Sequence, residues 1–184
     1  MRLFVAAELP KELADALAET LAVLRGNVRG RFVAPDSLHV TLAFLGNVES
    51  SRANAAAEAL EEACRGVNSF DVTLGELGSF GRRAKATLWQ GFSDDGALPE
   101  LAHAVRESLR ARGFAFDAKS FIAHVTLMRS ADLSRGTLAA PYTRTGCIDT
   151  ITLLSSDLSG DRPVYEPVCR VKLPEPLWGM QPLD

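Results

Sequence analysis

The chain has 184 residues, of which 47% are hydrophobic and 23% charged, and its formal net charge is −3 at pH 7. This composition is ordinary for a globular protein with a real core, and the acidic balance argues against an extended grip on a polyanion. No apolar run is long enough to cross a bilayer, and the N-terminus turns acidic and helical too soon for a secretory signal. We therefore expect a cytoplasmic protein of one domain.

The first half of the chain predicts two strands and two helices. Residues 2–9 favour a strand, and Pro10 is suited to the first position of a helix that ends at Gly26. A turn at residues 35–37 precedes a strand at 38–45, and a helix is predicted over 50–64. Two basic clusters, 25–31 and 82–85, are most simply solvated loop charge, although a local anion site needs only a few donors.

The second half alternates hairpins with a single helix. Strands are predicted at residues 70–77 and 86–92, around a Gly/Arg loop, and a helix over 98–112. Short or longer strands follow near 114–116 and at 123–130, 147–159 and 164–173, before a loosely held tail in which Trp178 could pack. Hairpins mixed with single helices predict an α+β fold with antiparallel pairing rather than a doubly wound sheet.

The three cysteines are widely spaced and form no CxxC pair, so neither a disulfide framework nor a zinc knuckle is predicted. We expect free buried thiols in a reducing compartment, at Cys64, Cys147 and Cys169.

One tetrapeptide, HVTL, occurs twice, at residues 39–42 and 124–127. Alternate residues of a strand share a face, so each copy places His and Thr on one face and Val and Leu on the other. His39 with Thr41, and His124 with Thr126, would converge if the two strands face each other across a cleft. Each copy lies in a separate half of the chain, which looks like a loose internal duplication.

Two imidazoles and two hydroxyls suit chemistry at a phosphodiester. A neutral histidine can take a proton from water while a protonated one gives a proton to the leaving oxygen, and threonine hydroxyls can hold the phosphate oxygens. No carboxylate cluster accompanies the motifs, so no metal or other cofactor is predicted. The alternative is structural: a histidine beside an apolar strand is often only a packed residue, and a four-residue repeat can arise by chance. The third histidine, His103, is expected on a helix surface or in packing.

The segments HVTLAFLG and HVTLMRS resemble the paired HxTx motifs of the 2H phosphoesterase superfamily, and most closely the bacterial and archaeal RNA 2′,3′-cyclic phosphodiesterases, also called 2′-5′ RNA ligases. The likeness extends to RLFVAAELP at the N-terminus, to LGSFGRRAKATLWQGF between the motifs, and to ITLLSSDLSGDRPVYEPV with its Tyr165. Nearly the whole chain is covered in the family's order.

The resemblance implies a single domain, residues 1–184, with two pseudo-symmetric lobes, one motif in each, and a cleft between them. It implies metal-independent hydrolysis of RNA 2′,3′-cyclic phosphate ends to 2′-phosphomonoesters, with weak reversible 2′-5′ ligation as an additional activity. His39 would be the proton donor, His124 the proton acceptor, and Thr41 and Thr126 the phosphate ligands. Strand geometry makes the two histidines equivalent, so the acid and base roles rest on the resemblance alone. A monomer without an obligate protein partner or membrane is expected.

Several positions depart from the family pattern or leave two readings. Ala43 replaces a frequent Lys and, by strand alternation, lies on the His39 face, so a positive charge near the phosphate would be missing. Arg129 matches a recurrent Arg and could bind the phosphate, but alternation places it opposite His124 unless the strand ends or bulges there; otherwise it is an exposed charge. The other departures are Ala123 in place of Pro and Phe32 in place of a frequent Trp.

Three further residues each leave two interpretations. Arg2 is expected on the surface of an edge strand, although it shares a face with Phe4 and could line the cleft. Phe4 and Phe44 are expected in the core, with base stacking as the alternative.

Two other functions fit the same residues. The substrate could instead be a small cyclic nucleotide or ADP-ribose cyclic phosphate, which the acidic net charge favours because a long RNA would want a basic track. The chain could also be a non-catalytic module that binds RNA ends, against which the two complete HxT sets argue.

Overall fold

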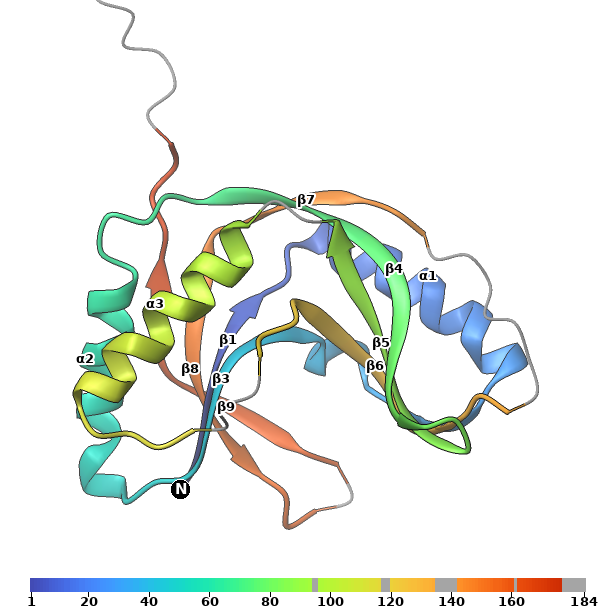
Figure 1. The fold of residues 1–184 in the computed structure, drawn as a ribbon, viewed down its shortest axis with the longest axis horizontal. Coiled ribbons are helices and arrows are strands. Elements are labelled where there is room, and N and C mark those ends of the chain that lie inside the picture. Colours follow the sequence, from blue (N-terminus) through green and yellow to red (C-terminus); the bar gives the residue numbers. More distant parts are fainter. Residues whose placement is uncertain (94–95, 117–119, 135–141, 161, 177–184) are drawn as a thin grey trace, which may run out of the picture.

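The computed structural model describes residues 1–93, 96–116, 120–134, 142–160 and 162–176 (Figure 1). Its strands form one nine-stranded antiparallel sheet in the order β7-β4-β5-β6-β3-β1-β8-β9, with β2 paired to β6 off this path. The strands are β1 (Arg2–Glu8), β2 (Arg29–Phe32), β3 (His39–Asn47), β4 (Phe70–Arg82), β5 (Lys85–Ser93), β6 (His124–Asp132), β7 (Thr145–Ile148), β8 (Thr150–Asp157) and β9 (Val164–Lys172). The expected α+β fold is therefore confirmed.

The sheet divides at its centre into two lobes. Strands β3 and β6 are paired only at Val40 and Val125, whereas their other neighbours are joined along most of their length. We call the two parts the β3 lobe (β3-β1-β8-β9) and the β6 lobe (β7-β4-β5-β6, with β2). Figure 1 shows the two lobes curving away from each other on either side of this narrow junction.

Each lobe has its own helices. Helix α1 (Lys11–Asn27) contacts β7 in the β6 lobe, while α2 (Ala53–Ala63) and α3 (Ala97–Ala111) pack on each other and against β9 and β3 of the other lobe (Figure 1). The leucines expected inside α1 are 0–2% exposed, because their spacing puts them on one face: Leu13, Leu17, Leu21 and Leu24. No helix in the described part of the chain is long and apolar enough to cross a membrane.

Some boundaries of the helices and strands agree with those predicted from the sequence, and others do not. Pro10 precedes α1 as its N-cap, and the second predicted helix begins as a 3-10 turn (Ser50–Arg52) before α2. Residues 114–116 form no strand, and the loop between β4 and β5 is only a two-residue turn because both strands extend into it. Trp178 lies outside the described residues.

The predicted strand over residues 147–159 is wrong as a single element. It is divided at Asp149 into β7, which pairs with β4, and β8, which pairs with β1 and β9, so its two parts join opposite ends of the sheet. Strand β2 was not expected at all. Of the three free cysteines only Cys64 is buried. Cys147 is exposed and Cys169 is half-buried, so the expectation of three buried thiols is wrong.

Candidate active site

Strand β6 carries a bulge directly after its HVTL tetrapeptide. Thr126 pairs with Trp89 and Met128 with Leu88, so Leu127 is an extra residue without a partner in that register. Leu127 and Met128 are consequently both buried, and the alternation of faces is shifted by one beyond them. Arg129 thereby returns to the face of Thr126, which is the position that a phosphate ligand would need.

The same bulge occurs in β3. Thr41 pairs with Ala6 and Ala43 with Val5, so Leu42 is the extra residue, and both Leu42 and Ala43 are buried. The prediction that Ala43 lies on the His39 face is therefore wrong: its side chain is 1% exposed and belongs to the hydrophobic core. A Lys at this position would have to be buried, so the missing charge of Ala43 has no direct bearing on the site.

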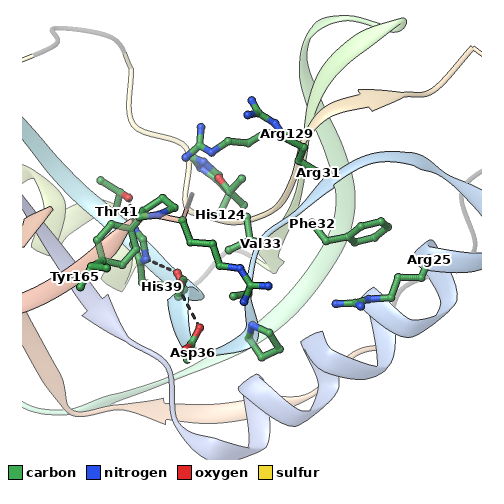
Figure 2. A pocket seen from close by; sticks show the side chains of 17 residues that line it. Arg25, Arg31, Phe32, Val33, Asp36, His39, Thr41, His124, Arg129 and Tyr165 are labelled. Atoms are coloured by element: carbon green, nitrogen blue, oxygen red, sulfur yellow. Dashed lines mark hydrogen bonds between the residues drawn. The ribbon is translucent and has the colours of Figure 1, made fainter. Parts of the chain in front are cut away.

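One cavity of about 810 Å³ brings the predicted site residues together. His39, Thr41 and His124 line it with Arg129, and Figure 2 shows the two imidazoles entering it from β3 and β6. Thr126 lines it as well. The cavity thus opens at the place where the two lobes meet, and strand alternation up to Thr41 and Thr126 correctly predicted which side chains face it.

Hydrogen bonds fix the ring of His39. Its Nδ1 lies 2.8 Å from the carbonyl oxygen of Ser37, which can only accept, so Nδ1 carries the hydrogen. Nε2 lies 3.1 Å from Oγ1 of Thr41 and, in the neutral ring, accepts from that hydroxyl. The rings of Phe4 and Tyr165 enclose the imidazole, with centroids 5.0 and 5.5 Å away.

His124 is held in a similar way. Its Nδ1 lies 2.7 Å from the carbonyl oxygen of Ile122, so this ring has the same tautomer, with Nε2 available to the cavity. Two aromatic rings again flank the imidazole: Phe80 at 5.2 Å and Trp89 at 5.7 Å between centroids. Each catalytic candidate therefore sits between two aromatic side chains with one nitrogen bound to the backbone two residues earlier.

Both histidines have a pKa below the ordinary value of 6.5. Burial is the main cause for each, because it penalises the charged imidazolium, and the positive charge of Arg129 lowers the pKa of both further. The hydrogen bonds to the carbonyls of Ser37 and Ile122 oppose this by favouring the protonated form. Both rings are therefore mostly neutral at pH 7 in the free protein, and an anion bound between them would raise both pKa values.

The cavity has more positive charge than the sequence predicted. Besides Arg129 it is lined by Arg25, Arg31 and Arg162, and among the described lining residues the one carboxylate is that of Asp36. Three of these arginines were missed as site residues. For Arg25 and Arg31 the available signal was the basic cluster at residues 25–31, whose simplest interpretation is solvated loop charge; no comparable signal marks Arg162.

The remaining candidates do not line the cavity. Phe4 is in the core as expected, but Phe44 is 38% exposed, with the guanidinium of Arg2 centred 4.6 Å from its ring, so a core position for Phe44 is wrong. His103 is exposed on α3 and does not line the cavity. Among the described residues, no group of three or more His, Cys, Asp or Glu side chains is placed to hold a metal ion.

Comparison with known proteins identifies relatives. A family model described as LigT like Phosphoesterase matches residues 7–89. An RNA 2′,3′-cyclic phosphodiesterase from Archaeoglobus fulgidus is 33% identical over 130 residues, 70% of this chain and 72% of the relative. One from Geobacillus stearothermophilus is 32% identical over 128 residues, 68% of this chain but only 41% of that longer relative. Escherichia coli LigT, solved in complex with 3′-AMP, superposes with a TM-score of 0.78 at 30% identity, covering 94% of this chain and 97% of that one.

Proposed function

The chain belongs to the LigT-like phosphoesterases, and on this premise we propose that it hydrolyses RNA 2′,3′-cyclic phosphate ends to 2′-phosphomonoesters without a metal ion. The observation that carries the proposal is the meeting of two His–Thr pairs and an arginine in one cavity. The names of the relatives supply the substrate class, which the geometry alone leaves open.

In the proposed reaction the cyclic phosphate lies between the two imidazoles. One neutral histidine takes a proton from water as the water oxygen attacks phosphorus, and the bond from phosphorus to the 3′ oxygen breaks. The other histidine, protonated, gives its proton to that leaving oxygen. Following the family resemblance, we assign His124 as the base and His39 as the acid.

Thr41, Thr126 and Arg129 would stabilise the phosphate. Hydroxyl and guanidinium groups donate to non-bridging oxygens, and they favour the transition state because charge accumulates there. Thr41 has a second role in this scheme. Its hydroxyl contacts Nε2 of His39 in the free protein, and it would turn from that nitrogen to the phosphate when His39 becomes protonated.

Binding of the substrate phosphate also accounts for the protonation of one histidine. Both imidazoles are mostly neutral in the free protein because burial lowers their pKa, whereas the reaction needs one of them charged. An anion within hydrogen-bonding reach favours the imidazolium and raises the pKa. Substrate binding would therefore bring one proton onto the pair.

The test is hydrolysis in EDTA of an oligoribonucleotide that ends in 2′,3′-cyclic phosphate, beside free 2′,3′-cyclic AMP. His39→Ala and His124→Ala should each reduce kcat by at least 100-fold, as expected for loss of a general acid or base. His103→Ala is the matched control, because this histidine is exposed on α3 and should have no effect. Turnover that survives both active-site substitutions would rule out the two-histidine mechanism.

A small cyclic nucleotide or ADP-ribose cyclic phosphate is the second candidate substrate, favoured by the net charge of −3. Faster hydrolysis of free 2′,3′-cyclic AMP than of the oligonucleotide would support it. Binding of the RNA end without any turnover would instead indicate a non-catalytic module. Adding an RNA with a free 5′ hydroxyl to the same reaction tests for 2′-5′ ligation.

A further inference from the structure

The cavity extends well beyond the two histidines. On the side away from His39 and Tyr165 it is lined by Phe32 of β2 and by Arg25 of α1, as Figure 2 shows. We call Arg25, Arg31 and Phe32 the arginine arm. At about 810 Å³ the whole cavity is near the upper end of the usual range of about 300–1,000 Å³ for ligand pockets. That is more room than one cyclic phosphate and its ribose fill.

Positive charge is concentrated where the arm meets β6. Arg31 stands directly opposite Arg129 in the register of β2 and β6, and the two side chains lie next to each other in Figure 2. Like charges at directly opposite positions of a sheet destabilise it. Neither arginine has an ion pair with any residue that the structure describes, and the chain as a whole is acidic. An anion bound between the two guanidinium groups would remove this repulsion.

The arm also has an aromatic surface. Phe32 is only partly buried, it lines the cavity, and the guanidinium of Arg25 is centred 5.1 Å from its ring. A planar ring beside a guanidinium is the combination that single-stranded nucleic acid sites use, since the ring stacks a base and the cation pairs with the backbone. The arm thus offers both contacts that a nucleotide needs.

We propose that the arginine arm binds the nucleotide immediately 5′ of the cyclic phosphate. Phe32 stacks its base, and Arg31 pairs with the phosphodiester that joins it to the terminal nucleotide. This inference rests on the proposed function and narrows it, because it makes the end of an oligoribonucleotide the substrate and a free mononucleotide a poor one. The acidic net charge is no obstacle, since only one phosphodiester has to be held.

The experiment compares kcat/KM for 2′,3′-cyclic AMP with that for the dinucleotide adenylyl-adenosine 2′,3′-cyclic phosphate. One stacked base is expected to favour the dinucleotide by about 5- to 150-fold. Phe32→Leu and Arg31→Gln should each lower the ratio of the two kcat/KM values toward one. Arg31→Gln should also reduce the extra salt dependence of the dinucleotide, which is about 0.7 in log–log slope for one phosphate contact.

Arg110→Gln is the matched control. Its guanidinium lies 5.3 Å from the ring centroid of Phe116, an arrangement like that of the arm, but neither residue lines the cavity. It removes the same charge as Arg31→Gln and should leave the ratio unchanged. Because Arg31 is exposed, its substitution provides a test even if Phe32→Leu impairs folding.

Equal kcat/KM for the two substrates in the wild-type protein, or an unchanged ratio in both arm variants, would overturn the inference. If neither substrate is hydrolysed, the proposed function fails, and the arm is then tested by calorimetric titration with adenylyl-adenosine 2′-phosphate. Weaker binding to Arg31→Gln than to the wild type and to Arg110→Gln would support the arm. Equal affinities would refute it.

Discussion

Replacing Gly78 by Ala should displace the ring of Trp89, which flanks His124, while leaving the fold in place. Gly78 pairs directly with Trp89 across β4 and β5, and the indole ring lies over the space where a side chain would be. A Cβ atom at this position would lie 2.7 Å from Cζ3 of Trp89 and closer still to two other ring atoms. Carbon atoms in contact are about 3.5–4.0 Å apart, so the ring has to move by about 1 Å or more.

That movement reaches the chemistry through His124. The Trp89 ring is 5.7 Å from the imidazole and 5.2 Å from Phe80, which itself packs on His124. A displacement of about 1 Å in a catalytic group can cost about 100-fold, so we expect kcat to fall by about 10- to 100-fold. The cost of the extra methyl to stability should be about 1–3 kcal/mol.

The assay is steady-state hydrolysis of the cyclic phosphate substrate together with thermal unfolding. Gly26→Ala is the control, because a Cβ atom there meets nothing within 4 Å and the helix should, if anything, become more stable. Trp89→Phe should restore part of the activity of Gly78→Ala, since it removes the ring atoms that clash. Normal kcat in Gly78→Ala, or a loss that Trp89→Phe does not relieve, would refute the claim that the Trp89 ring positions His124.

Three further outcomes follow from the site and the thiols. Because burial lowers the pKa of both His39 and His124, the plot of kcat/KM against pH should be a bell centred below pH 6.5. The bell for kcat should lie at higher pH, since bound phosphate favours the imidazolium. A rate that only rises to a plateau would contradict this scheme. Thr41→Val should reduce kcat/KM by about 10-fold or more with little change in melting temperature, and Thr41→Ser should retain most activity. Cys147 is exposed and should react with a thiol reagent in the native protein, whereas Cys64, buried and with its pKa raised to about 11, should react only after unfolding; mass spectrometry of labelled peptides distinguishes them.

Local sequence patterns predicted the helices and strands better than they predicted which strands pair with each other. The apolar spacing of α1 and the alternation in HVTL depend on neighbours in sequence, and both are present in the structure. Sheet order depends on contacts between distant segments, which periodicity does not encode. The clearest case is Asp149, where a run that reads as one strand is divided between two ends of the sheet.

The two lobes could not be recovered by cutting the sequence in half. Helix α1 follows β1 directly but packs in the other lobe, and β8 and β9 return from the C-terminal part to the lobe of β1. A duplication suggested by two identical tetrapeptides is thus interleaved in space. The two motifs themselves lie on β3 and β6, the innermost strands of the two lobes.

The assumption that successive strand residues alternate between the two faces failed where a β-bulge interrupts the strand. The HVTL letters give the faces of His39 and Thr41 correctly, but one extra residue in the strand exchanges the faces of the residues that follow it, up to the next irregularity. Nothing in the local sequence marks this bulge, since Leu42 and Ala43 are ordinary strand residues. The same event in β6 explains why Arg129 lines the cavity when strict alternation places it on the opposite face.

The two bulges also show how a symmetric frame can bind a substrate in one direction. They place equivalent residues, Phe44 in β3 and Arg129 in β6, next to the two His–Thr pairs, but only the arginine lines the cavity. The histidines themselves are held alike and would accept a phosphate in either orientation. Arg129 is directly opposite Arg31 on the neighbouring strand, so the β6 side carries an adjacent pair of arginines, whereas the β3 side contributes Arg162, just before β9. If the β6 side holds the upstream nucleotide, the leaving 3′ oxygen always meets the same histidine, and two equivalent imidazoles acquire distinct roles as acid and base.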